Sequence, residues 1–142
     1  YLHDDPPTPA QLAAATEAVD TLLDLVDLGG VRRWIGVAGT VTSLVAVHLG
    51  LTAYDRARVH AAGIPLAELR DLAGWTARAR VADLIALGPI SAQRCEVIGG
   101  GALIIDRIAA RLQVDGLVAS EADILDGLAG GLLDGDTAQR AL

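Results

Sequence analysis

The stretch Trp34-Ile35-Gly36-Val37-Ala38-Gly39-Thr40 decides the fold of this chain. Its first residues are apolar, as in a strand that is buried on both faces of a parallel sheet. Thr40 then caps an expected helix over 41–49. Glycines at such a turn let the backbone approach an anion, and the free N–H groups and the helix dipole favour negative charge there. The stretch therefore predicts either a phosphate-binding loop or a tight turn in which Thr40 is only a cap.

Helical patterns account for most of the remaining sequence. Thr8 and Pro9 predict a helix start and Gly29-Gly30 its end. Three aspartates of this helix are expected on a solvated face: Asp20, Asp24 and Asp27. The other expected elements are, in order, an irregular stretch over 54–64 or a short strand near Val59, helices over 65–75, 77–87 and 91–112, a strand over 116–119 and a helix capped by Ser120.

The helix over 91–112 would be the longest, and it would hold Gly99-Gly100-Gly101 in its interior. A glycine there costs about 1 kcal/mol relative to alanine. Three glycines in a row therefore indicate close backbone packing or the close approach of a ligand.

The expected fold class is α/β, helix-rich, with about two parallel strands, over 34–38 and 116–119. Two short strands do not complete a parallel sheet, because such strands need cover on both faces and come in larger sets. The chain also contains no methionine. We therefore expect a piece of a longer protein, with the partner strands upstream.

Composition limits the classes of partner. The net charge is −7, all eleven basic residues are arginine, and aromatic residues make up only 3%. This balance disfavours nucleic acid as a partner. No apolar run approaches the roughly 20 residues of a membrane span, so no membrane partner is expected. Cys95 is the only cysteine, which excludes an internal disulfide and suits a cytoplasmic protein.

Several segments, taken together and in order, carry a family resemblance. They are Gly36–Thr40 with Val41-Thr42-Ser43-Leu44, Arg94-Cys95-Glu96-Val97-Ile98 with the glycine run after it, Val118–Gly127, and the pairs Tyr54-Asp55 and Val59-His60. This set resembles the motifs of the exopolyphosphatase and guanosine pentaphosphate phosphohydrolase (Ppx/GppA) family. Ala61 stands where the family tends to have glycine, and Cys95-Glu96 where it has Ala-Asp.

The resemblance implies a partial ribonuclease-H-like domain of the actin-like ATPase superfamily. Residues 1–142 would form the C-terminal portion of the second actin-like domain, with the first domain and the start of the second absent. The intact protein would release terminal phosphate from polyphosphate or guanosine pentaphosphate by magnesium-assisted attack of water. A non-catalytic phosphate-binding or assembly module of the same fold is the alternative. By itself this piece is expected to be inactive and to self-associate, and the native enzyme is expected to be a homodimer.

The resemblance also places the candidate site. The residues expected to bind phosphate are Gly36, Ala38, Gly39 and Thr40. Arg94 reaches either the ligand or a carboxylate. Glu121 and Asp123 either serve the start of the following helix or touch the cleft. His60 is expected to serve in packing or hydrogen bonding. No catalytic residue and no metal ligand is assigned to this chain, so the Mg²⁺ ligands are expected mostly in the missing part.

Overall fold

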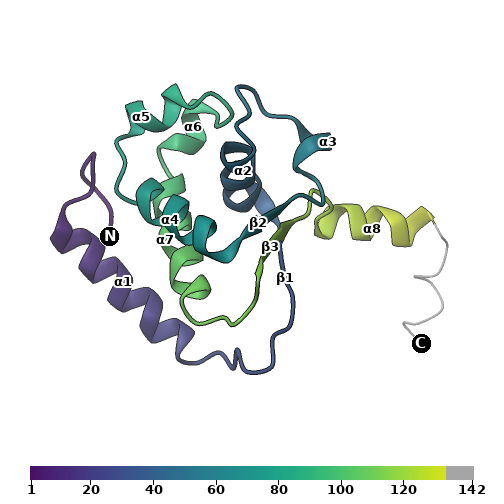
Figure 1. Cartoon of the computed structure of the whole chain (residues 1–142), viewed down its shortest axis with the longest axis horizontal. Coiled ribbons are helices and arrows are strands. Elements are labelled where there is room, and N and C mark those ends of the chain that lie inside the picture. The colour runs from purple at the N-terminus through teal and green to yellow at the C-terminus, as the bar shows by residue number, and fades with distance from the viewer. Residues whose placement is uncertain (134–142) are drawn as a thin grey trace.

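The computed structural model describes residues 1–133, in which helices surround one small sheet (Figure 1). The elements are, in chain order, α1 (Pro9–Leu23), β1 (Trp34–Gly36), α2 (Ala38–His48), α3 (Arg56–Val59), β2 (Gly63–Pro65), α4 (Leu66–Thr76), α5 (Val81–Ala86), α6 (Ala92–Cys95), α7 (Ile98–Ala109), β3 (Gly116–Ala119) and α8 (Ile124–Leu133).

The sheet has the strand order β1-β3-β2. β1 and β3 are parallel, with Ile35 opposite Val118, which confirms the two expected parallel strands. β2 pairs antiparallel with β3 and was not predicted. One face of the sheet is buried through Ile64 and Leu117, whereas Ile35 is 57% exposed on the other face. The sheet is therefore covered on one side only.

Helix α2 lies at the centre of the core. Six consecutive residues, 41–46, are buried, including the polar Thr42 and Ser43. α4 and α7 pack on each other and against α2, next to β3, and enclose the core with it (Figure 1). A helix that is buried all round holds the residues at its first turn in a fixed place, so α2 is a rigid base for the loop before it.

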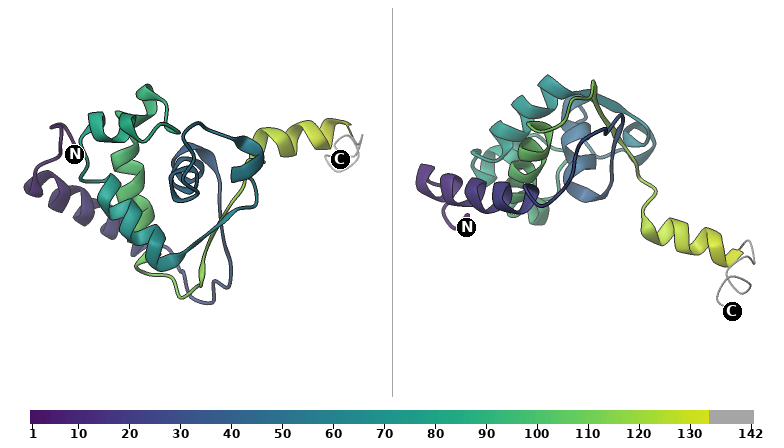
Figure 2. Two further views of the ribbon diagram at one scale, coloured as in Figure 1. Left: turned by 45° about the horizontal axis from the view of Figure 1, so that its top comes forward. Right: turned by 90° about the horizontal axis from the view of Figure 1, so that it is seen from below.

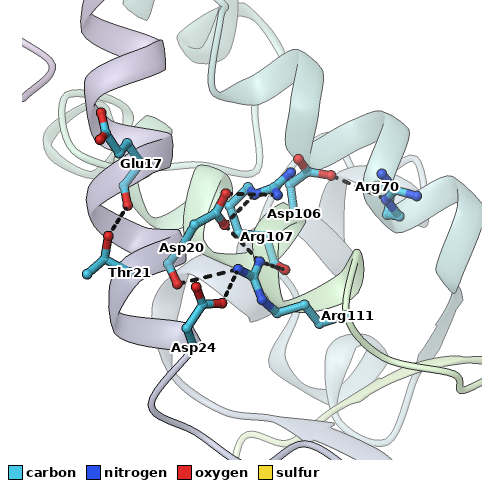
Figure 3. Close-up of polar contacts among 8 residues, drawn as sticks. All are labelled: Glu17, Asp20, Thr21, Asp24, Arg70, Asp106, Arg107 and Arg111. Carbon is cyan, nitrogen blue, oxygen red and sulfur yellow. Dashed lines mark hydrogen bonds and ion pairs between the residues drawn. The ribbon is translucent and has the colours of Figure 1, made fainter.

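Helix α1 is held on α7 by ion pairs (Figure 3). Asp20 accepts hydrogen bonds from Arg107 at 2.8 and 3.0 Å and from Arg111 at 2.7 Å. Arg111 also reaches Asp24 at 3.0 Å. The solvated face expected for this helix was therefore wrong at Asp20, which is part-buried against Arg107 and Arg111, whereas Asp24 is 73% exposed as expected. The two arginines lower the pKa of Asp20 below its ordinary value of 3.8, Arg107 most strongly.

The single helix expected over 91–112 is two helices, because the helical conformation is interrupted between α6 and α7 at Glu96-Val97. The three glycines consequently lie in the first turn of α7 rather than in a helix interior. Only Gly101 is closely packed, since an added Cβ would lie 2.5 Å from Thr40 Oγ1. Gly100 has no atom within 4 Å of that position. α1 rather than this segment is the longest helix within residues 1–133.

Other boundaries also differ from the prediction. α1 ends at Leu23 instead of Gly29-Gly30. A tighter turn follows it, in which the N–H groups of Leu25 and Val26 donate to the carbonyls of Leu22 and Leu23. Val59 ends a short helix instead of forming a strand, because Asp55 caps that helix through the N–H groups of the next turn. The helix expected over 77–87 is only Val81–Ala86.

Two expected caps are replaced. α2 already begins at Ala38, so Thr40 is inside its first turn and Val37 precedes it without a side-chain cap. α8 begins at Ile124, so Ser120 lies too early. Asp123 takes its place: its carboxylate accepts from the N–H of Leu125 at 2.8 Å, while Asp126 accepts from the Asp123 N–H. This reciprocal pair resembles a capping box, except that the Asp123 side chain accepts from the second rather than the third N–H of the helix.

α8 projects away from the rest of the molecule (Figure 2). Its apolar residues Ile124, Leu125 and Leu128 are 77%, 69% and 59% exposed. Within residues 1–133, no helix is long and apolar enough to cross a membrane.

Candidate phosphate-binding site

The turn between β1 and α2 is strained and carries free donors. Ala38 has a φ of +67°, in the left-handed region that only glycine adopts easily. The first N–H groups of a helix have no partner within the helix, and no side chain caps α2. The turn thus presents unpaired N–H groups at a helix N-terminus, with backbone strain of the kind found at functional sites.

Arg94, from α6, lies directly against this turn. A Cβ added to Gly39 would lie 2.5 Å from Arg94 Cζ and 2.6 Å from its Nη2. The guanidinium also lies 3.5 Å from Ser43 Oγ, and no carboxylate of residues 1–133 forms an ion pair with it. Glycine at position 39 therefore makes room for an arginine whose charge is not neutralised.

A cavity of about 280 Å³ opens in front of the turn. Its lining residues are Ala38, Gly39, Thr42, Tyr54, Arg94, Ser120, Glu121 and Asp123. Several of the candidates named from the sequence are thus brought together, although they come from α2, α6 and the loop after β3. That loop is attached at the same edge of the sheet, because the Ser120 N–H donates to the Gly36 carbonyl at 2.8 Å.

Gly36 and Thr40 do not line the cavity. A Cβ on Gly36 would lie 2.8 Å from Val41 Cγ1, so this glycine permits close packing between β1 and α2. The Thr40 side chain faces Gly101 on α7. Both residues therefore position the turn rather than line the cavity.

Glu121 closes the opposite wall through several contacts. Tyr54 donates its hydroxyl to Glu121 Oε1, and the Glu121 N–H donates to His60 Nδ1 at 3.1 Å. Arg56 binds the Glu121 carbonyl at 2.8 Å and lies 3.5 Å from its carboxylate. Burial, and next the Glu121 carboxylate, raise the pKa of Tyr54 above its ordinary 10.0, so the phenol is protonated at neutral pH. His60 has the hydrogen-bonding role expected for it.

The sequence did not point to Thr42 or Ser120 as residues of a ligand site, whereas Glu121 and Asp123 were both alternatives for it. Thr42 is one of the few buried polar residues of α2, at 4% exposure. The sequence did carry a signal for Thr42: it forms a polar pair with Ser43 in an otherwise largely apolar helix, and buried polar groups need partners. Tyr54 had been quoted only as part of a family motif.

The described residues do not form a metal site by themselves. Within residues 1–133, no three His, Cys, Asp or Glu side chains are grouped so that they could hold a metal ion. The two carboxylates of the cavity already accept hydrogen bonds, Glu121 from Tyr54 and Asp123 from a helix N–H. The donor set thus does not fit Mg²⁺ unless further ligands come from outside these residues.

Comparison with known proteins identifies the family of the chain. The sequence profile of the Ppx/GppA phosphatase family matches residues 1–135. The chain belongs to this family. Proteins named exopolyphosphatase 2 from two strains of Mycobacterium tuberculosis are 39% identical to it, over 90% of the chain and 43% of their own length. The chain thus spans less than half of these Ppx/GppA relatives.

Solved structures of the family share the fold. An exopolyphosphatase-like protein is 33% identical, with a TM-score of 0.87, and all of this chain matches 47% of it. The Ppx/GppA member from Aquifex aeolicus matches 96% of this chain and 45% of its own, at 20% identity and a TM-score of 0.83, which concerns the fold alone. The expected α/β, actin-like fold class is confirmed by these Ppx/GppA neighbours.

Proposed function

We propose that this chain supplies one wall of the phosphate cleft of an exopolyphosphatase. In this proposal the intact protein releases terminal phosphate from inorganic polyphosphate by attack of water, with Mg²⁺ as the assisting ion. The family membership and the names of the relatives support the reaction class. The rest of the active site belongs to the part of the protein outside this chain.

One observation carries the proposal: the Arg94 guanidinium, without a carboxylate partner in residues 1–133, lies against the N-terminal turn of α2 inside a cavity. A guanidinium and unpaired backbone N–H groups are the donors that bind phosphate oxygens.

The proposed role is binding and charge stabilisation. Phosphoryl transfer leaves little covalent work for a protein, because its barrier is lowered by positioning and by neutralising charge on the phosphoryl oxygens. The N–H groups of Ala38 and Gly39 hold the terminal phosphate, and Arg94 holds its oxygens from the side. Glu121 is engaged by Tyr54 and Arg56, which makes it a structural acid rather than the base that activates water. The chain alone is therefore expected to bind phosphate without hydrolysing it.

Calorimetric titration of the chain with tripolyphosphate tests this proposal. Arg94→Gln is expected to weaken binding about tenfold or more, because a hydrogen bond to a charged group contributes about 1.5–3 kcal/mol. Arg80→Gln is the matched control, since Arg80 is exposed before α5 and does not line the cavity. Equal affinities of the two variants would refute the assignment of Arg94.

Turnover is tested on the full-length protein by measuring phosphate release from polyphosphate and from guanosine pentaphosphate. Arg94→Gln is expected to lower release from polyphosphate, with the circular dichroism spectrum unchanged. Binding without any release by the full-length protein would instead favour the non-catalytic phosphate-binding module.

We also propose that the full-length protein is a homodimer. The exposed apolar residues of α8 and the uncovered face of the sheet at Ile35 support self-association, because apolar patches of this kind mark interfaces. Light scattering on the full-length protein tests it, and a monomer at micromolar concentration would refute it.

A further inference from the structure

An apolar cavity lies on the side of the core that faces α1 (Figure 1). It measures about 550 Å³ and is lined by α1, the end of α4, α5 and the segment from α6 into α7. Most of its wall is aliphatic, and it shares no lining residue with the cavity at Gly39. Pockets for small molecules have volumes of about 300–1,000 Å³ and the same mainly apolar character. Size and wall together suit a small organic molecule.

Gly100 is the member of the glycine run that packing does not explain. Gly101 packs tightly on Thr40, and a Cβ on Gly99 would make an ordinary contact, 3.7 Å from the Thr76 carbonyl oxygen. A Cβ on Gly100 would meet no atom within 4 Å, and Gly100 lines the apolar cavity. Since glycine in a helix points to close packing or to the close approach of a ligand, Gly100 keeps room for a ligand.

Thr76, the last residue of α4, presents an unpaired hydroxyl to the apolar cavity. The residue is only 2% exposed and lines the cavity. Within residues 1–133 its side chain forms no hydrogen bond. Every completely enclosed polar side-chain atom of these residues has a partner, so the Thr76 oxygen is in contact with open space. Buried polar groups need partners, and a polar group on the ligand would supply the missing one.

The polar part of the lining is negatively charged. Asp4, Asp5 and Glu96 line the cavity together with His3 and no other basic side chain. None of the three acids forms an ion pair within residues 1–133. Asp5 accepts from the Val81 N–H at 2.9 Å, a bond that leaves its charge in place. Electrostatic complementarity therefore favours a cation over an anion in this cavity.

We propose that the apolar cavity binds a small organic cation, whose apolar body lies among the helices and whose ammonium group donates to the Thr76 hydroxyl. The site is separate from the phosphate site, and it takes a ligand of opposite charge. Gly100 leaves space for the body of this ligand, and Glu96 contributes to the preference for a positive charge.

Calorimetric titration of the full-length protein with octylamine, octanol and octanoate tests the proposal, because the three probes share one apolar body. Octylamine is expected to bind at least several-fold more tightly than octanol, and octanoate most weakly. Thr76→Val is expected to weaken octylamine binding about tenfold, because the ammonium loses a charge-assisted hydrogen bond. Thr76→Ser keeps the hydroxyl and is expected to retain it. Gly100→Leu is expected to abolish it by filling the cavity.

Charge selection is tested with Glu96→Gln, which is expected to reduce the preference for octylamine over octanoate. Glu17→Gln is the matched control for net charge, since Glu17 is an exposed residue of α1 that does not line the cavity. Tripolyphosphate affinity is expected to be unchanged in Thr76→Val, which checks the fold of this variant independently.

Three results would overturn the proposal. They are absence of octylamine binding by the wild type, octanoate binding as tight as that of octylamine, and equal octylamine affinities of Thr76→Val and Thr76→Ser. A lower mass of Gly100→Leu in light scattering, without octylamine binding by the wild type, would identify the cavity as an interface with a second copy instead.

Discussion

The glycine run at the start of α7 offers a sharp test of the packing, because two adjacent glycines in it, Gly100 and Gly101, have different surroundings. A Cβ on Gly100 meets no atom within 4 Å. A Cβ on Gly101 would lie 2.5 Å from Thr40 Oγ1, 2.9 Å from its Cγ2 and 3.2 Å from its Cβ. Rotation about the Cα–Cβ bond of Thr40 would leave its Cβ at 3.2 Å, which is still a tight contact. Gly100→Ala therefore places a methyl group in open space, whereas Gly101→Ala places the same group in a steric clash with Thr40.

The expected magnitudes follow from two terms. Replacing a helical glycine by alanine stabilises the folded state by about 0.5–1 kcal/mol, and this term is similar for both variants. Overpacking costs typically about 1–3 kcal/mol and applies to Gly101→Ala alone. The difference between the two free energies of unfolding is thus about 1–3 kcal/mol, with Gly100→Ala more stable than the wild type. An unfolding entropy near 2.1 cal/mol/K per residue converts this to a Tm difference of about 3–10 °C.

Urea unfolding followed by far-ultraviolet circular dichroism measures both free energies under one condition. Because Thr40 belongs to the first turn of α2, Gly101→Ala is also expected to weaken tripolyphosphate binding, although Gly101 does not line the cavity. Two variants of equal stability would refute the close packing of α7 on α2. Unchanged phosphate binding in a destabilised Gly101→Ala variant would refute the mechanical link from α7 to the loop.

Further predictions concern backbone strain, the loop and acid stability. Ala61 has a φ of +62° and is exposed. Ala61→Gly is expected to raise the free energy of unfolding by up to about 1 kcal/mol, because the left-handed strain of about 1–2 kcal/mol exceeds the entropy cost of glycine. A lower urea midpoint than that of the wild type would contradict this. Gly39→Val is expected to displace Arg94 and to weaken tripolyphosphate binding at least tenfold with the circular dichroism spectrum unchanged; wild-type affinity in the folded variant would count against the loop. Arg107 and Arg111 lower the pKa of Asp20. The ionised Asp20 therefore stabilises the folded state above pH 3.8, and this contribution is lost as the pH falls through the lower pKa that Asp20 has in the folded state. Urea midpoints across this acid range should fall less steeply for Asp20→Asn than for the wild type, and parallel curves would refute the ion-pair cluster.

The turn and its immediate neighbours were predictable because their signals are local. An apolar run before glycines marks the end of a buried strand, and the parallel pairing of β1 with β3 follows from two such runs. β2 was not predictable from its own three residues, Gly63–Pro65, which carry no alternating pattern. It forms because Gly116 has no side chain where the Ile64 carbonyl approaches, a contact between distant parts of the chain.

The candidate site was likewise predictable only in part. Ala38, Gly39 and Arg94 were found through motifs, and the structure brings them to one cavity. Thr40 was placed correctly in sequence but not in direction, because α2 starts three residues earlier than predicted and the Thr40 side chain faces Gly101 on α7. Helix boundaries shift by a residue or two at little cost in local energy, and each residue of shift rotates a side chain by about 100° around the axis. Sequence therefore identified the loop better than it identified which atoms of the loop face a ligand.

The acidic composition finally shows why net charge is a weak guide to the ligand of a small domain. The charge of −7 argues against a polyanion when it is treated as uniform. In the structure, several acids are already paired: Asp20 and Asp24 bind Arg107 and Arg111, and Glu121 is engaged by Tyr54 and Arg56. Screening limits the reach of the remaining surface charges to about 10 Å at ordinary salt. An anion at Gly39 is thus governed by Arg94 and the nearby N–H groups, and the rest of the acidic surface acts mainly on how fast the anion arrives.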